Sequence, residues 1–435
     1  MAEEQTMMER KKYLDALIRR EWNGQVKVIT GIWGCGKSTL LFELFRDHLL
    51  EDGVPLQNII SIALDDDVNV RYRDPYELSA YVRSRAADPG QKYYVLIDEV
   101  QYAISKEELL QKDSPVRLYS VLNGLLHMKN VDVYVTGSNS KMLSKDISTE
   151  FRGRGDVVKV YPLSFAEYYS AAGMDKTDAY AEYSMYGGMP YLFNLVSDED
   201  KFNYLADLFE EIYFKDIEER YTIRLPGVLR ELTSDLCSST GSLTNATKIA
   251  RTLQSTKSIK VDSQTISSYL TYLTDSFLFS EALRFDVKGK KYFEYPSKYY
   301  CTDIGLRNVR LGLRQQEETH IMENIIYNEL VVRGYHVDVG VIPVSYTNDV
   351  GSHSQKNCEI DFIARKGSRK YYIQSAVSMD DPQKEETELR PLLAVGDSFK
   401  KIVVSKSYGK SWIDEKGILR INLIDFLLDE NSLDR

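Results

Sequence analysis

The residues best suited to chemistry in this chain lie in one glycine-rich stretch, residues 31–38, which reads GIWGCGKS. It fits the pattern G-x-x-x-x-G-K-[ST], in which backbone N–H groups and a lysine ammonium bind a chain of phosphates. Lys37 would lie against the β- and γ-phosphates, and the hydroxyl of Ser38 would bind Mg²⁺. We therefore predict a site for ATP and magnesium. Its predicted nucleotide-binding residues are Gly31, Ile32, Trp33, Gly34, Cys35, Gly36, Lys37, Ser38 and Thr39.

The residues on either side of this stretch support the prediction. Residues 26–30 (VKVIT) read as a short buried strand, and residues 40–45 (LLFELF) read as an apolar-rich helix. A phosphate-binding loop requires this order of strand, glycine loop and helix, because the positive end of the helix adds to the field on the phosphates. A chance glycine turn would not explain the strand, the Lys-Ser pair and the helix together.

A second apolar strand, residues 93–97, ends in two carboxylates, Asp98 and Glu99. Such a pair is common at strand ends and means little alone. After a phosphate-binding loop it predicts that Asp98 holds Mg²⁺, directly or through water, and that Glu99 orients or deprotonates the attacking water. Glu99 and Lys37 are thus predicted catalytic residues, and Ser38 and Asp98 are predicted metal ligands.

A third strand, residues 131–136, leads into Gly-Ser-Asn-Ser, where Asn139 would touch the γ-phosphate or the attacking water. The alternative for this segment is an ordinary turn. Further along, Arg152 or Arg154 would stabilise transition-state charge, in cis or from a neighbouring subunit, and the alternative is a surface arginine. Residues 175–225 read as helices. Arg220 and Arg224 lie beyond their apolar run, and an arginine there is a weaker candidate for a second nucleotide sensor.

Length and charge limit the remaining possibilities. A chain of 435 residues is too long for one ordinary core, so two to four domains are expected. The net charge of −10 provides no overall attraction for nucleic acid, so any DNA contact needs a local basic patch. The four cysteines and five histidines are scattered, which does not resemble a zinc site and suits a reducing compartment. Without an apolar run long enough to span a bilayer or a signal-peptide core, the expectation is a cytoplasmic protein with no membrane contact.

Several motifs together resemble a family of prokaryotic predicted ATPases within the AAA+ and archaeal-type P-loop NTPases. The main one is residues 151–168, FRGRGDVVKVYPLSFAEY, and others stand at 186–190 (YGGMP), 216–217 (DI), 298–306 (KYYCTDIGL), 323–324 (EN) and 328–330 (NEL). The resemblance spans nearly the whole chain and favours Arg154, after Gly153, as the phosphate-reading arginine. It implies an ATPase domain, a winged-helix region and a C-terminal domain of unknown function. Many members carry a basic pair in the loop where this chain has Trp33 and Gly34.

The middle of the chain suggests a winged helix-turn-helix, with helices at 228–237, 245–253 and from 263 onward. Strands at 277–283 and 292–295 would form a wing, joined through residues 288–291. The first residues of a recognition helix contact bases, and lysines contact phosphates. The alternative is a winged helix that only packs against the ATPase. The candidate DNA-binding residues are Ser263, Gln264, Thr265, Lys288 and Lys290, with Lys257, Lys260 and Lys291 as further phosphate contacts.

The C-terminal part resembles a restriction-endonuclease-like core. A helix at 321–333 carries Glu323, a following hairpin carries Asp361, and the next strand ends in Gln374-Ser375-Ala376. Active members have Glu-x-Lys at the last position to complete a Mg²⁺ site. Glutamine coordinates only weakly and alanine cannot replace lysine, so we expect a degenerate, inactive nuclease fold in which Glu323, Asp361 and Gln374 retain at most a weak metal site.

Together these patterns predict an α/β protein: a P-loop NTPase parallel sheet, a winged-helix domain and a C-terminal α/β nuclease-like domain. The expected boundaries are 1–225, 226–312 and 313–435. The predicted function is a Mg²⁺-dependent ATPase, slow without a partner, whose hydrolysis switches the two attached domains. The alternatives are a nucleotide-gated DNA-binding regulator and a metal-dependent nuclease. Expected partners are ATP and ADP, DNA through the winged helix, and either a second copy of the chain or another protein.

Overall fold

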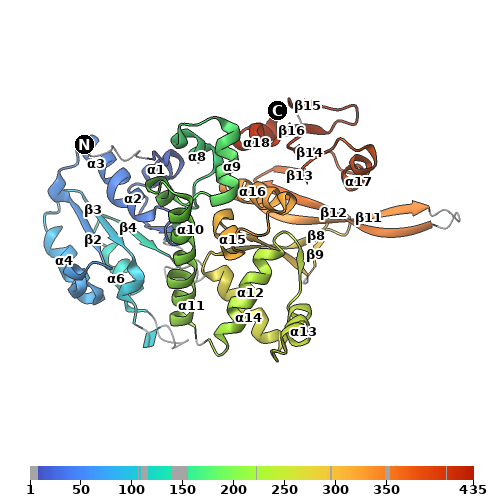
Figure 1. The fold of residues 1–435 in the computed structure, drawn as a ribbon. Coiled ribbons are helices and arrows are strands. Elements are labelled where there is room, and N and C mark those ends of the chain that lie inside the picture. Colours follow the sequence, from blue (N-terminus) through green and yellow to red (C-terminus); the bar gives the residue numbers. More distant parts are fainter. Residues whose placement is uncertain are drawn as a thin grey trace. The chain divides into compact units, whose positions relative to one another are not determined.

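The computed structural model describes residues 8–105, 107–108, 116–138, 155–221, 223–293, 296–347, 353–407 and 409–435 (Figure 1). The chain divides into two compact units. The first unit comprises Met1–Pro162, Ile212–Thr222 and Asp275–Phe277, and the second comprises Leu163–Glu211, Ile223–Thr274 and Leu278–Arg435. Each unit is described separately below.

The first unit is built on a five-stranded sheet in which every strand pair is parallel and the order is β2-β3-β4-β1-β5. Parallel strands covered on both faces read as continuous apolar runs. Strand β3 is such a run up to Asp98, whereas β1 and β4 each include one charged residue, Lys27 and Asp132. The three strands predicted around the phosphate-binding loop are confirmed. The strands are β1 (Val26–Thr30), β2 (Ile59–Ala63), β3 (Tyr93–Asp98), β4 (Val131–Gly137) and β5 (Gly155–Lys159).

The helices of the first unit begin where the sequence provides caps. The carboxylate of Asp74 accepts N–H groups from Tyr76 and Glu77, and Pro75 is the first helical residue of α4. Helices α4 and α6 contact each other (Figure 1). The helical segments are α1 (Lys11–Ile18), α2 (Lys37–Thr39), η1 (Leu40–Phe45), α3 (Arg46–Glu51), η2 (Leu56–Asn58), η3 (Asp67–Arg73), α4 (Pro75–Arg85), η4 (Val100–Ala103), α6 (Arg117–Leu125) and α11 (Lys215–Arg220).

One ion pair interrupts the apolar interior of this sheet. Lys27 on β1 donates to Asp132 on β4, and the lysine side chain is fully buried. Asp132 also accepts the Trp22 N–H and the Tyr134 hydroxyl, each at 2.9 Å. Burial lowers the pKa of Lys27, opposed by the charge of Asp132. The pair joins the neighbouring strands β1 and β4 near their amino ends.

The second unit opens with helices whose N-termini are capped by side chains. Ser164 and Glu167 form a capping box at the start of α8, and Asp175 caps α9. The buried carboxylate of Asp303 caps α15 and also accepts the Gly188 N–H at 2.7 Å. These elements are α8 (Phe165–Ala172), α9 (Lys176–Tyr186), η6 (Pro190–Asn194), α10 (Asp198–Asp207) and α15 (Ile304–Arg310), and η7 (Leu208–Phe214) leads from this unit into α11.

The three helices predicted for the middle of the chain are present, but the predicted wing is wrong. Strand β7 pairs with β10, and β10 with β6, in a three-stranded antiparallel sheet. Strand β9, which was expected to pair with β7, instead forms a hairpin with β8, because Asp286 binds the turn and β8 adds to β11 in another sheet. The elements are α12 (Pro226–Ser238), β6 (Leu243–Thr244), α13 (Ala246–Lys257), α14 (Ser263–Asp275), β7 (Phe279–Ala282), β8 (Arg284–Asp286), β9 (Lys291–Tyr292) and β10 (Ser297–Cys301).

The rest of the second unit is organised around an eight-stranded mixed sheet of order β15-β16-β14-β13-β12-β11-β8-β9. Strands β11, β12 and β13 form an antiparallel meander, and β14 and β16 continue it in parallel. Figure 1 shows β11 and β12 as a long hairpin that extends beyond the neighbouring strands. The elements are α16 (Glu318–Val332), β11 (His336–Thr347), β12 (His353–Lys366), β13 (Arg369–Ala376), α17 (Pro382–Leu393), β14 (Lys400–Ser405), β15 (Trp412–Ile413), β16 (Leu419–Asn422), α18 (Leu423–Leu428) and η8 (Ser432–Asp434).

Among the described helices, none is both long enough and apolar enough to cross a membrane.

Candidate nucleotide site

The glycine loop lies at the carboxyl end of β1, which is hydrogen-bonded to β4 on one side and β5 on the other. Strand β3 pairs with β4, so the ends of β1, β4 and β3 lie in this order along one edge of the sheet. Because all strands are parallel, their carboxyl ends lie at the same edge, where α/β sheets bind ligands. The predicted loop and the predicted carboxylate pair therefore lie one strand apart.

The loop needs glycine for two different reasons. At Gly34 and Gly36 the φ angles are 78° and 92°, a left-handed region that other residues rarely adopt. At Gly31 the constraint is space, since a Cβ would lie 2.1 Å from the Val160 carbonyl oxygen. The Val160 N–H donates to the Thr30 carbonyl at 2.7 Å, which holds these two segments together. The loop is thus a tight backbone turn against the segment that follows β5.

Lys37 points back into this turn. Its side chain is buried, and Nζ donates to the carbonyl oxygens of Gly31 and Ile32, each at 3.2 Å. Ser38 and Thr39 in the same turn of α2 are exposed, while Cys35 is buried with its Sγ 3.6 Å from the Val160 carbonyl oxygen. A buried ammonium and exposed hydroxyls at the start of a helix suit an anionic ligand and its metal.

Asp98 and Glu99 are both buried at the end of β3. Thr136 on β4 holds them in place, because its hydroxyl donates to Asp98 Oδ1 and accepts the Glu99 N–H at 3.0 Å. Glu99 has a φ of 51°, an uncommon conformation for a non-glycine residue, of the kind that gathers at functional sites. Burial raises the pKa of Glu99, Lys37 opposes this increase, and Asp98 adds to it. The carboxylate therefore interacts electrostatically with the lysine of the loop.

A chain of polar contacts extends from Glu99 to α11. The amide of Gln101 donates to Glu99 and lies 3.3 Å from the Ser138 hydroxyl, while its own oxygen is buried with no hydrogen-bond partner. Arg220 Nη2 lies 3.3 Å from the same hydroxyl and pairs with Asp216 at 2.5 Å. An arginine from the segment 212–222 thus reaches the end of β4, next to the carboxylate pair.

The structure brings together the predicted residues of the loop and of the β3 end. Asn139, Arg152 and Arg154 lie outside the described residues. The candidate DNA-binding residues are all in the second unit but belong to different elements. Ser263, Gln264 and Thr265 begin helix α14, whereas Lys288 and Lys290 lie in the turn between β8 and β9.

Sequence reasoning missed four supporting residues. Thr136 was treated as the last residue of a strand, and Gln101 and Ser138 were given no role. Gln101 gave no signal in the sequence, because its contact with Glu99 depends on the left-handed conformation of Glu99 before the turn at Val100–Ala103. The Tyr213 hydroxyl, which donates to the Trp33 carbonyl oxygen at 3.1 Å, gave no local signal because 180 residues separate the two.

The oxygen donors of this edge suit Mg²⁺, a hard cation that binds one or two carboxylates together with water and phosphate oxygens. The Ser38 hydroxyl and the Asp98 carboxylate are donors of this kind, and Thr136 orients the carboxylate. The residues present therefore fit the metal that a nucleoside triphosphate brings.

Comparison with known proteins agrees with this geometry. Residues 23–169 match a family model described as an AAA domain, and residues 177–317 match one described as a domain of unknown function (DUF8612). An uncharacterized protein of Haemophilus influenzae is 33% identical over 429 residues, covering 97% of this chain and 99% of that protein. This chain belongs to the same family as the Haemophilus protein. An uncharacterized protein of Methanocaldococcus jannaschii is 26% identical over 378 residues, covering 83% and 76%.

Solved structures give weaker matches. The Aeropyrum pernix ORC1 protein in complex with DNA is 12% identical, with a TM-score of 0.31, covering 70% of this chain and 92% of that one. AMPPCP-bound DnaA from Aquifex aeolicus is 13% identical, with a TM-score of 0.26, covering 62% and 88%. TM-scores this low do not establish a common overall fold. The match to an AAA domain covers the glycine loop and the β3 end, and it indicates a P-loop NTPase domain.

Proposed function

We propose that this protein is a Mg²⁺-dependent ATPase. The observation that carries the proposal is the placement of buried Lys37, in the glycine loop after β1, and of buried Glu99, at the end of β3, on the same edge of the parallel sheet. One group suits the binding of phosphate and the other suits the activation of water, and both belong to the first unit at one edge of its sheet. The AAA domain match over residues 23–169 supports the same conclusion.

The proposed roles follow from the chemistry of each group. The loop N–H groups and Lys37 bind the β- and γ-phosphates, and Ser38 and Asp98 hold the magnesium, which supplies charge neutralisation when bound. Glu99 accepts a proton from water, or orients the water, for attack on the γ-phosphate. Asn139 and Arg154 remain proposed γ-phosphate contacts from the sequence, and Arg220 is a further candidate because it reaches Ser138.

We also propose that hydrolysis is communicated to the second unit along the chain. Arg220 is the last residue of α11, and the chain enters the second unit within a few residues of it. When ATP is bound, Arg220 would leave the Ser138 hydroxyl and contact the γ-phosphate instead. The end of α11 would then shift when the phosphate leaves. The proposed organisation of this protein is an ATPase region over 1–225, a winged-helix region over 226–312 and a nuclease-like region over 313–435.

Phosphate release tests the proposal. Wild type, Glu99→Gln and the matched control Glu43→Gln are compared at saturating ATP and Mg²⁺. Glu43 has the same chemistry but is exposed on the helix after the loop. The expected result is a rate at least 100-fold lower for Glu99→Gln and unchanged for Glu43→Gln, since general-base catalysis contributes typically about 10²–10⁴-fold. Equal rates in all three proteins would remove Glu99 from the mechanism.

A second proposed function, DNA binding gated by nucleotide, rests on the start of α14. Ser263 and Gln264 are exposed at the first turn of this helix, as base-reading residues must be. The lysines give less support: Lys257 pairs with Glu231, and Lys288 donates to the Pro343 carbonyl oxygen at 3.2 Å. Duplex binding that weakens steeply with salt and changes with ATP would support this function, and no mobility shift at low salt would end it.

We propose that the nuclease-like region does not cleave nucleic acid. The expected order of a helix with Glu323, a hairpin with Asp361 and a further strand corresponds to α16-β11-β12-β13, and α17 and the parallel strand β14 follow it. The side chains at the end of β13 remain Gln374, Ser375 and Ala376, without a lysine. Incubation of plasmid DNA with the protein and Mg²⁺ or Mn²⁺ should leave the DNA intact. Cleavage that Asp361→Ala abolishes would overturn this.

A further inference from the structure

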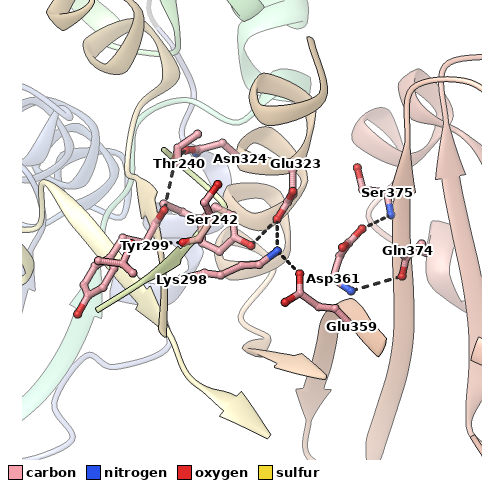
Figure 2. A network of polar contacts seen from close by, with 12 residues as sticks. Thr240, Ser242, Lys298, Tyr299, Glu323, Asn324, Glu359, Asp361, Gln374 and Ser375 are labelled. Atoms are coloured by element: carbon pink, nitrogen blue, oxygen red, sulfur yellow. Dashed lines mark hydrogen bonds and ion pairs between the residues drawn. The ribbon is translucent and has the colours of Figure 1, made fainter. Parts of the chain in front are cut away.

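A buried lysine lies among carboxylates where β10, α16 and β12 meet (Figure 2). Lys298 Nζ lies 2.9 Å from Glu323 Oε1 and 2.7 Å from Glu359 Oε1, and its side chain is only 4% exposed. The Tyr300 hydroxyl donates to the same Glu323 oxygen at 2.7 Å. The ammonium is therefore bound by carboxylates from a helix and a strand, while it is carried by a strand of a different sheet.

The charges around Lys298 favour its protonated form. Burial alone would lower its pKa, but Glu323, Asp361 and Glu359 outweigh burial, and the pKa is raised. Burial raises the pKa of Asp361, Glu323 adds to this increase, and Lys298 opposes it. The ammonium thus compensates a group of acids that would otherwise repel one another.

The set of donors that the resemblance suggests for a metal does not suit one. Gln374 Oε1 lies 3.4 Å from the Asp361 N–H, and Gln374 Nε2 donates to Glu388 Oε2 at 2.8 Å. The Ser375 N–H donates to Asp361 Oδ2 at 2.8 Å, as Figure 2 shows. No group of three or more His, Cys, Asp or Glu residues in the described part of the chain is arranged to hold a metal ion. Lys298, rather than a metal, is the charge that these acids face.

The opposite side of Glu323 is closed by backbone. A Cβ at Gly241, where φ is +73°, would lie 2.9 Å from Glu323 Oε1. Next to it, Thr240 donates to Asn324 Oδ1 at 2.8 Å, and Asn324 also accepts the Cys301 N–H at 2.9 Å. The cluster thus joins the loop after α12 and strand β10 to helix α16 and strand β12. Little room remains for an added ion while the ammonium is present.

We propose that Lys298 is a built-in cation that occupies a latent divalent-metal site formed by Glu323 and Glu359. Two carboxylate oxygens within 3 Å of one nitrogen converge on a point that a hard cation can also occupy, with water completing its coordination. Removing the ammonium while keeping the volume of its stem leaves both carboxylates facing that point. The wild-type protein binds no divalent ion there, and its second unit needs none for stability.

The test counts Mn²⁺ bound to the full-length chain without nucleotide, by electron paramagnetic resonance of free Mn²⁺. Every protein carries Ser38→Ala, which removes the proposed metal ligand of the glycine loop. Lys298→Met should bind one Mn²⁺ per chain more than its parent, and Lys298→Arg should bind no more than its parent. The additional ion should be lost in the double variant Lys298→Met, Glu323→Gln.

The same proteins are followed by thermal unfolding with and without Mn²⁺. Lys298→Met should have a lower Tm than its parent and regain part of the loss in Mn²⁺, while the Tm of the parent does not respond. Lys298→Met that folds and gains no Mn²⁺ would overturn the proposal. If Lys298→Met does not fold, Mn²⁺ binding is compared between the parent and the parent carrying Glu323→Gln. Loss of a bound Mn²⁺ ion on Glu323→Gln would show that the parent already binds a metal there and would overturn the proposal. Equal Mn²⁺ binding by the two proteins supports it. Because nucleotide is absent, the outcome is independent of ATPase activity.

Discussion

Replacing Gly31 by alanine should disable the glycine loop through a steric conflict that the structure specifies. The added Cβ would lie 2.1 Å from the Val160 carbonyl oxygen, about 0.9 Å inside the 3.0 Å limit that real Cβ contacts respect. The obstacle is backbone, so rotation of a side chain cannot relieve it. The same Cβ would lie 3.0 Å from Cys35 Sγ, which packs on that carbonyl. Either the loop or the segment after β5 must move.

The cost can be estimated from overpacking in other proteins, which is about 1–3 kcal/mol. In a unit of this size that corresponds to a decrease in Tm of about 2–12 °C. The effect on ligand binding should be larger than the effect on stability, because a displaced Gly31 also moves the carbonyl oxygen that Lys37 Nζ contacts at 3.2 Å. We expect the affinity for ATP to fall at least 10-fold.

Thermal unfolding and equilibrium ATP titration of Gly31→Ala measure both effects. Gly124→Ala is the matched control: Gly124 lies within α6, and its Cβ would meet only Arg83 Nη2, at 3.5 Å. Alanine is the better helix former by about 1 kcal/mol, so the control should be unchanged or slightly more stable and should bind ATP normally. A Gly31→Ala protein with the wild-type Tm and wild-type ATP affinity would refute this reasoning.

Three other predictions concern buried charge and the arginine near the site. Lys27→Met should lower the free energy of unfolding by about 3–5 kcal/mol, because Asp132 is left buried without its ion-pair partner. The exposed control Lys11→Met should change it by less than about 0.5 kcal/mol, and similar losses for both variants in denaturant titrations would contradict this. Burial raises the pKa of Asp303 to about 6. Protonation of this carboxyl therefore favours the folded state, and the resulting stability, about 3 kcal/mol, is fully present below pH 4 and is lost as pH rises through 6. Asp303→Asn should lack this component of the pH profile of unfolding, and parallel profiles would contradict it. Arg220→Ala should weaken ATP binding by about 10–100-fold and leave ADP binding nearly unchanged, as for loss of a hydrogen bond to a charged γ-phosphate; equal weakening of both nucleotides would argue against a sensor role.

The sequence predicted those parts of the fold whose determinants are local. An apolar strand followed by Gly-x-x-x-x-Gly-Lys-Ser and an apolar helix could have few other structures, and the loop after β1 is as expected. The carboxylates after β3 were equally predictable, because a buried parallel strand must place its following residues at the ligand edge of the sheet. Asp74 before Pro75 is a similarly local signal for the start of α4.

The sequence could not predict pairings that depend on distant segments. The strands predicted at 277–283 and 292–295 look like partners in a hairpin. Instead, β7 pairs with the buried strand β10, and β9 pairs with β8. The Lys298 cluster was missed for the same reason, since its members come from positions 298, 323 and 359 and meet only when two sheets and a helix are assembled. The contact of Arg220 with Ser138 likewise depends on the return of residues 212–222 to the first unit.

The measurement that tests the central claim most directly is the affinity of wild type and Lys37→Ala for Mg²⁺-ATP and for AMP, determined by equilibrium titration. If a triphosphate lies in the loop after β1, removal of the ammonium should weaken ATP binding about 100-fold, corresponding to about 3 kcal/mol for a charge-assisted contact. AMP, which has no β- or γ-phosphate, should change by less than about 3-fold by the same reasoning. Equal affinity of the two folded proteins for Mg²⁺-ATP would contradict the account.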